Sequence, residues 1–293
     1  MTAGARFGIS THLFHGERLG RSHLERAASS GFDLVEIFAT RTHFDYHDPA
    51  RAADLRRTLD ALRMDAWSMH APICDGFTAG IWGRAYSNAS TDARARAEAV
   101  DETRASVEAA RVLGCQVLVL HLGIPNGQLI PSGANDRHAL QRSLEPIADA
   151  CTGAGVRLAL EVIPNDLATP AALIEWLSGD LELGDAGVCL DIGHAHLLGS
   201  APEAAEALSG YVITTHLHDN RGRSDDHLVP FDGTVDWPTT MMTLSKIGYT
   251  GPLVFELPDH GDAARVLQRT ADARRRIQAI LDDLAQPLEF TEG

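Results

Sequence analysis

Seven of the eight short apolar runs in the sequence end on, or next to, a residue that can bind a metal ion or move a proton. These residues are Glu36, His70, His121, Glu161, Asp191, His216 and Glu256. The adjoining loops add His194, His196, His218, Asp219, Asp225 and His227. A hydrogen bond usually explains one such residue at the end of a strand. Seven buried together cost several kcal/mol each unless they are paired or metal-bound, so the pattern predicts a divalent-metal site.

Some of these candidates stay outside the predicted ligand set. Glu36 belongs to the second run, where lining a pocket or supporting a ligand explains it as well as ligation does. His196 and His218 lie two residues beyond stronger candidates, so they either orient ligands or face the pocket. Trp82, in the long stretch after His70, either stacks on a substrate or packs against its own loop.

Residues so far apart in sequence meet only if the fold brings the ends of their strands to one rim. Runs rich in Val, Ile and Leu alternate with Ala- and Arg-rich stretches of helical periodicity, which is typical of repeated βα units. The predicted strands are Phe7–Ser10, Leu34–Phe38, Ala66–His70, Gln116–His121, Arg157–Val162, Ala186–Asp191, Val212–His216 and Leu253–Leu257. The predicted helices are Leu19–Ser30, Pro49–Arg63, Thr91–Leu113, Asn135–Ala154, Thr169–Ser178, Pro202–Leu208, Trp237–Ile247 and Ala263–Leu284.

Eight such units predict an α/β fold, a single-domain (β/α)8 TIM barrel over residues 1–285, followed by a loose tail at 286–293. Glycines are expected to end helices at Gly31, Gly114, Gly155 and Gly248. The longest connections, Ala71–Ser90 and Asn220–Asp236, follow strands, which is the active-site face of such barrels. A doubly wound open sheet alternates in the same way but needs a phosphate-type glycine loop after an early strand, and the sequence lacks one.

Composition excludes several classes of protein. Hydrophobic residues make up 44% of the 293 residues and charged residues 22%, without an apolar run long enough for a bilayer or a basic, apolar leader. We therefore expect a soluble, cytoplasmic protein. The formal charge of −15 repels polyanions, so no nucleic acid partner is expected. Four scattered cysteines without a C-x-x-C pair predict reduced, mostly buried thiols.

Over nearly its whole length the sequence resembles the xylose isomerase-like TIM barrel superfamily. That superfamily includes sugar phosphate isomerase/epimerase-like proteins, inosose-processing enzymes and endonuclease IV-type AP endonucleases. The resemblance is carried by ALEVIPN, CLDIGHAH, THLHDNRGRSDDHLVPFDGTVDW and VFELP. Its epimerase-like pattern implies that Glu161, Asp191, His216 and Glu256 bind one divalent metal ion. Oxygen and nitrogen ligands without a thiolate favour Mn²⁺, with Mg²⁺, Co²⁺ or Zn²⁺ as alternatives.

The endonuclease IV pattern, which binds three zinc ions, is also complete in this sequence. Its positions are filled by His70, His121, Glu161, Asp191, His194, His216, Asp225, His227 and Glu256. Three departures favour the sugar branch: no basic face is obvious, APICDG follows His70, and the opening strand FGISTHLF is closer to the sugar enzymes. The resemblance therefore implies a sugar isomerase or epimerase, with a trinuclear zinc phosphodiesterase as its rival.

For the isomerase we expect proton transfer through an enediolate of a sugar, keto-sugar or cyclitol. Glu161 and Glu256 would exchange the proton on opposite faces of the substrate, and His194 would stabilise the developing oxyanion. A keto-sugar or cyclitol lyase or dehydratase stays open, as does a non-catalytic sugar-binding barrel.

Further metal-binding or substrate-binding roles stay open for several residues: His70, His121, Asp225, His227, Arg223 and Trp82. Arg221 and Arg223 either hold a substrate oxygen or phosphate, or are solvated loop residues, and no glycine-rich phosphate cradle supports a phosphorylated substrate. The family implies a homo-oligomer, for which a dimer is favoured.

Overall fold

In the computed structural model, each of the eight predicted apolar runs forms one strand of a closed parallel barrel. The structure describes residues 5–127 and 130–286. The barrel strands are β1 (Phe7–Ser10), β2 (Leu34–Phe38), β3 (Asp65–His70), β6 (Val117–Leu120), β7 (Arg157–Glu161), β8 (Gly187–Asp191), β9 (Val212–Leu217) and β10 (Leu253–Phe255). They pair in the order β1-β10-β9-β8-β7-β6-β3-β2, and the ring closes where β1 pairs with both β10 and β2. The (β/α)8 prediction is confirmed.

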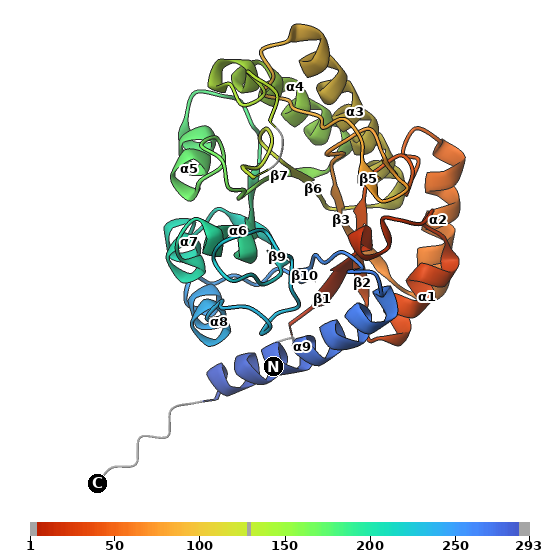
Figure 1. Ribbon diagram of the computed structural model, residues 1–293, viewed down its shortest axis with the longest axis vertical. Coiled ribbons are helices and arrows are strands. Elements are labelled where there is room, and N and C mark those ends of the chain that lie inside the picture. The colour runs from red at the N-terminus through yellow and green to blue at the C-terminus, as the bar shows by residue number, and fades with distance from the viewer. Residues whose placement is uncertain (1–4, 128–129, 287–293) are drawn as a thin grey trace.

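Helices surround the strands on the outside of the barrel (Figure 1). They are α1 (Arg21–Ser29), α2 (Pro49–Leu62), α3 (Ala93–Leu113), α4 (Arg137–Ala154), α5 (Pro170–Ser178), α6 (Ile192–Leu197), α7 (Ala201–Ala207), α8 (Trp237–Lys246) and α9 (Ala263–Leu284). Aspartates begin several of them: the Asp92 carboxylate, for example, accepts the N–H groups of Arg94 and Ala95 at the start of α3. Gly114 and Gly155 end α3 and α4 in the left-handed conformation that a glycine adopts without strain.

The strands are buried on both faces, which explains why their sequences are almost continuously apolar. In β6, Val117 and Val119 pack with other small side chains in the smaller of two apolar clusters, whereas Leu118 and Leu120 belong to the large one. Trp67 of β3 packs against the smaller cluster, and its indole N–H donates to Thr214 Oγ1 of β9. The small cluster therefore lies under the rim on which the predicted site residues stand.

Three elements depart from the predicted repeat. A 3₁₀ turn, η1 (Thr11–Phe14), follows β1, and helix α6 begins directly after β8. The long connection after β3 contains a small antiparallel hairpin, β4 (Phe77–Thr78) and β5 (Ile81–Trp82). All three are too short to show a hydrophobic period, so sequence patterning does not detect them.

Three further predictions from the sequence can be compared with the described residues. All four cysteines are free and buried, as expected. No helix in residues 5–127 and 130–286 is long and apolar enough to cross a bilayer. Of the predicted tail at 286–293, residues 287–293 lie outside the described residues.

Candidate metal centre

Four ionisable side chains from consecutive strands meet at the carboxyl-terminal rim of the barrel. Glu161 and Asp191 are the last residues of β7 and β8, His216 lies in β9, and Glu256 directly follows β10. All four are buried, and one ligand atom from each lies within 4.8 Å of those of the others. The parallel ladder makes this possible, because it pairs Asp191 with His216 directly. We call these four residues the strand-anchored group.

One ring nitrogen of His216 faces the other residues of the strand-anchored group, and the other nitrogen is held by a hydrogen bond on the opposite side of the ring. Its Nδ1 lies 3.0 Å from Glu161 Oε1 and 3.4 Å from Glu256 Oε2. Its Nε2 lies 3.0 Å from Glu36 Oε2, which also accepts a hydrogen bond from the Ser68 hydroxyl. Burial opposes ionisation of Glu36, but the charge of His216 outweighs it and lowers the pKa of Glu36. Glu36 therefore orients a ring nitrogen toward the centre, as carboxylates behind metal-binding histidines do.

The second oxygen of Glu161 faces a different pair of histidines. His70, the last residue of β3, and His121, directly after β6, each place Nε2 3.1 Å from Glu161 Oε2. The Nδ1 of His70 donates to the backbone carbonyl of Ala71, so its Nε2 is the nitrogen left for a ligand. The three side chains form a second group with metal-ligand spacing.

A third group lies on α6 and on the loop between β9 and α8. His194 Nε2 and His227 Nε2 lie 3.1 and 3.2 Å from Asp225 Oδ2. The other ring nitrogen of each histidine is bonded to a backbone carbonyl, that of Val162 for His194 and that of Glu256 for His227. The two nitrogens that face this oxygen are therefore presented by imidazole rings already fixed from behind, and His218, directly after β9, completes the group.

Two buried aspartates position this third group. Asp191 begins α6: its Oδ1 accepts the backbone N–H of His194 at 2.7 Å. Asp219 holds the loop that carries Asp225 and His227, since it accepts four hydrogen bonds. The donors are the backbone N–H groups of Asn220, Phe231 and Val235 and the indole N–H of Trp237.

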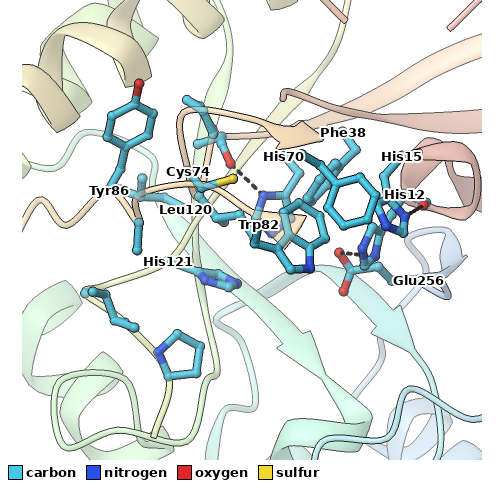
Figure 2. Close-up of a pocket in the computed structure, with 18 of the residues that line it drawn as sticks. His12, His15, Phe38, His70, Cys74, Trp82, Tyr86, Leu120, His121 and Glu256 are labelled. Carbon is cyan, nitrogen blue, oxygen red and sulfur yellow. Dashed lines mark hydrogen bonds and ion pairs between the residues drawn. The ribbon is translucent and has the colours of Figure 1, made fainter. Parts of the chain in front are cut away.

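A cavity of about 590 Å³ opens beside these groups. His70, His121, His194, Asp225, His227 and Glu256 all contribute to its wall. Figure 2 shows Trp82, Phe38 and His12 gathered near Glu256, whereas Tyr86 and Cys74 lie apart from them on the other side of His70. The cavity is thus lined by the candidate metal ligands on one side and by aromatic rings beside them.

A profile of the xylose isomerase-like TIM barrel family matches residues 24–281. The chain belongs to this family.

Individual related sequences and structures are consistent with membership of this family. An uncharacterized protein of Methanocaldococcus jannaschii is 29% identical over 270 residues, which cover 89% of this chain and 86% of that protein. The structure of a D-tagatose 3-epimerase-like protein is 25% identical, with a TM-score of 0.77 over 95% of this chain and 98% of that one. The fold is also shared with a structure of the IOLI protein with a zinc atom, which is 16% identical, with a TM-score of 0.72 over 96% of this chain and 100% of that one.

In this xylose isomerase-like barrel the carboxylates set the protonation of the histidines. Burial alone would lower the pKa of His194, but Asp191 and Asp225 raise it to about 10. In the same way Glu161 raises the pKa of His70 to about 9, and Asp225 raises that of His227 to about 9. A metal ion that binds these nitrogens must therefore displace protons at neutral pH.

The sequence-predicted residues do not all reach the cavity. Trp82 lines it from the hairpin, with its ring stacked on His15 at 4.9 Å between centroids. Arg223 is exposed on the loop after β9 and is not among the residues that line the cavity. His196 bonds to Thr234 away from the centre, whereas His218 lies 2.9 Å from Asp191 Oδ1.

Sequence reasoning missed two histidines that line the cavity. His12 and His15 lie in and after η1, and the buried Nδ1 atom of His12 lies 3.9 Å from Glu256 Oε1 without a hydrogen-bond partner among the described residues. Burial lowers the pKa of His12 well below its usual range, so its ring is neutral. The signal was present in FGISTHLF, where a histidine follows the first strand by two residues.

Proposed function

We propose that this chain is a divalent-metal-dependent isomerase or epimerase that acts on a sugar, keto-sugar or cyclitol. One observation carries the proposal: His70, His194, His216 and His227 each bond one ring nitrogen to a protein acceptor and turn the other toward a cluster of carboxylates. This is how protein side chains present metal-binding imidazoles. The similarity to a D-tagatose 3-epimerase-like structure supports the sugar substrate.

The strand-anchored group fits a divalent ion. It offers carboxylate oxygens and one imidazole nitrogen, a donor set that suits Mn²⁺, which we favour, as well as Mg²⁺, Co²⁺ or Zn²⁺. Cys189 lies next to Glu161 and His216, but burial raises the pKa of its thiol well above the usual range, so it does not compete as a thiolate. When bound, the ion would polarise a carbonyl and an adjacent hydroxyl and acidify the C–H bond between them.

The residues of the chain would then move the proton. Glu161 and Glu256 approach His216 from strands β7 and β10, with Oε atoms 3.0 and 3.4 Å from its Nδ1. One carboxylate would take the proton and the other return it, which suits inversion at a carbon. His194, which lies 3.8 Å from Glu161, would donate a hydrogen bond to the oxygen on which negative charge develops.

Metal analysis combined with proton exchange tests this proposal. The purified protein, loaded with Mn²⁺, is incubated in D2O with a panel of ketoses, inososes and keto-glycosides, and deuterium in the recovered compounds is measured by mass spectrometry. We expect about one ion per chain in the strand-anchored group and deuterium at a carbon next to a carbonyl, both lost after chelation. Products that lack one water would indicate a dehydratase at the same site.

A second candidate is a trinuclear zinc phosphodiesterase of the endonuclease IV type. It is favoured by the three groups of ligands on one rim, two of which share Glu161. Against it, the lining residues of the cavity include no lysine or arginine within the described parts of the chain. Three zinc ions per chain, cleavage of abasic DNA and no deuterium exchange would replace the isomerase with this function.

A further inference from the structure

The cavity has a polar side and an apolar side. The polar side is formed by the ligand groups described above, whereas the apolar side contains Ile73, Cys74, Tyr86, Leu120, Ile124 and Pro125. In Figure 2, Tyr86, Cys74 and Leu120 lie well apart from Glu256. A cavity of about 590 Å³ falls in the range for drug-sized ligands. A free monosaccharide held at the metal ligands would leave the apolar side unfilled.

The apolar side offers few hydrogen bonds to a ligand, because its polar side chains other than Tyr86 are already bonded to the backbone. Asn88 donates to the carbonyl of His121 and accepts from the N–H of Gly123. The Thr103 hydroxyl donates to the carbonyl of Ala99, and the Cys74 thiol to that of Gly76. A second sugar ring in this place would lose the water that binds its hydroxyls, with only the Tyr86 hydroxyl among the described side chains of the apolar side to replace it.

Charge excludes anionic groups from the same place. Among the described residues that line the cavity, none is a lysine or an arginine, and Asp225 and Glu256 are the acids. A phosphate or carboxylate away from the metal ligands would therefore be buried without a cation, which is strongly unfavourable. The group that fills the apolar side must be neutral.

Further aromatic rings line the cavity near Glu256. Trp82 is 39% exposed, stacks on His15 and meets Phe77 at 4.7 Å between ring centroids. Phe38 lies in the same wall, 6.1 Å from Trp82. Such rings attract planar aromatic groups by edge and offset contacts.

We propose that the substrate carries a neutral aromatic group on its sugar or cyclitol part, as an aryl glycoside does, and that this group occupies the apolar side of the cavity. The inference rests on the proposed function, since it names the substrate class of that site. It places the polyol end at the ligand groups and the aromatic end against Tyr86, Leu120 and Ile124.

Three matched compounds test the inference with the Mn²⁺-loaded full chain: phenyl 3-keto-β-glucoside, methyl 3-keto-β-glucoside and fructose 6-phosphate. Titration calorimetry should give the phenyl compound at least about tenfold higher affinity than the methyl compound, with a more negative heat-capacity change because more apolar surface is buried. Fructose 6-phosphate should bind more weakly than either. Equal affinity of the phenyl and methyl compounds, or tighter binding of the phosphate, overturns the inference.

Variants on helix α3 locate the aromatic group. Ala99 faces the cavity, so A99F should abolish the advantage of the phenyl compound, whereas A97F on the exposed face of the same helix should preserve it. I124N, at another wall of the cavity, changes the polarity of the side chain rather than its size. It should also reduce the advantage of the phenyl compound over the methyl compound. The test therefore stays decisive if the A99F protein does not fold. An advantage that survives both A99F and I124N places the phenyl group elsewhere and contradicts the inference.

Deuterium exchange from D2O, measured on the same compounds, separates this inference from the proposed function. Tight, A99F-sensitive binding of the phenyl compound without exchange into either glucoside supports the aromatic subsite and refutes the isomerase. Exchange into both glucosides with equal affinity and equal kcat/KM supports the isomerase and refutes the aromatic subsite. If neither deuterium exchange nor preferential binding of the phenyl compound is observed, both the proposed function and the aromatic subsite are refuted.

Discussion

The two halves of the candidate site are built in different ways. The strand-anchored group stands on β7 to β10, where ladder hydrogen bonds and parallel register fix every backbone position. Asp225 and His227, which we call the loop-anchored pair, stand on a long loop whose shape depends on the side chain of Asp219. The backbone of the barrel therefore positions the strand-anchored group, whereas the position of the loop-anchored pair depends on the hydrogen bonds of one side chain. Changes to the two halves should therefore have separable effects.

The largest effect is expected at Glu161, because its two oxygens serve two groups at once. E161Q removes the charge that His70, His121 and His216 share. We expect a loss of about 10³-fold in the rate of deuterium exchange, together with loss of the bound ion, because a general base and a ligand disappear together.

E182Q changes an exposed glutamate of the same barrel and serves as the control for E161Q. Exchange rates and metal content should match the unchanged protein. A fully active E161Q protein would remove Glu161 from the proposed mechanism.

A smaller and more selective effect is expected at Asp219. D219N leaves at least one of its four buried donors without an acceptor and should lower the free energy of unfolding by about 1–3 kcal/mol. The loop-anchored pair should move out of position while the strand-anchored group keeps its ion, so the unfolding temperature should fall while metal analysis gives an unchanged metal content. D226N, in the same loop, is the control. Loss of the ion from the strand-anchored group would contradict the independence of the two halves.

The pH dependence of stability should come from His194 and His227, whereas that of metal binding should come from the strand-anchored group. The pKa values of His194 and His227 are raised to about 10 and 9 by nearby carboxylates. In the metal-free protein this contributes stability that is fully present below the ordinary histidine pKa of about 6.5 and is lost as pH rises through 9 to 10. Metal binding in the strand-anchored group has the opposite dependence, because the ion replaces a proton on His216, whose pKa is also raised well above its usual range by the charged groups around it.

Apparent metal affinity should therefore rise by up to about tenfold per pH unit for each proton displaced, between pH 6 and 9. Competition with a chelator of known proton affinity measures this slope. H138Q, on the exposed start of α4, should leave it unchanged. A flat profile would show that His216 does not exchange a proton for the ion.

The smallest effect is expected at Arg223, which the sequence offered as a substrate-binding residue. Its side chain is exposed and lies outside the cavity lining. R223A should change kcat/KM for exchange by no more than about twofold, since a solvated loop charge interacts weakly with a bound neutral substrate. A tenfold loss would mean that the loop closes over the substrate.

The contrast between the halves also explains what the sequence could predict. Glu161, Asp191 and Glu256 end or follow apolar runs, so a repeat of βα units is enough to bring them to one rim. The strand bounds of β1 and β2 and the bounds of α9 agree with the predicted ones. Periodicity and strand polarity are local properties, and they carry this part of the fold.

The remaining features depend on tertiary contacts that have no local pattern. Which side of His216 faces the centre is decided by Glu36, which is 180 residues away in sequence. The hairpin that carries Trp82 and the helix that carries His194 are too short for a period to show. His12 follows the first strand and was available to the same reasoning, but its approach to Glu256 follows from the barrel closing between β1 and β10.

The carboxylate of Asp191, which caps helix α6, limits how this site can change during evolution. One oxygen of its carboxylate starts a helix and the other faces His216, so a single residue serves folding and the proposed metal site. Substitutions at Ala99 or Trp82 can change what the cavity accepts while the barrel stays intact. A shift of Asp191 by one residue would instead move the helix, His194 and the rim together. New substrate preferences in such a barrel should therefore evolve through its loops and outer wall, while this aspartate keeps its place.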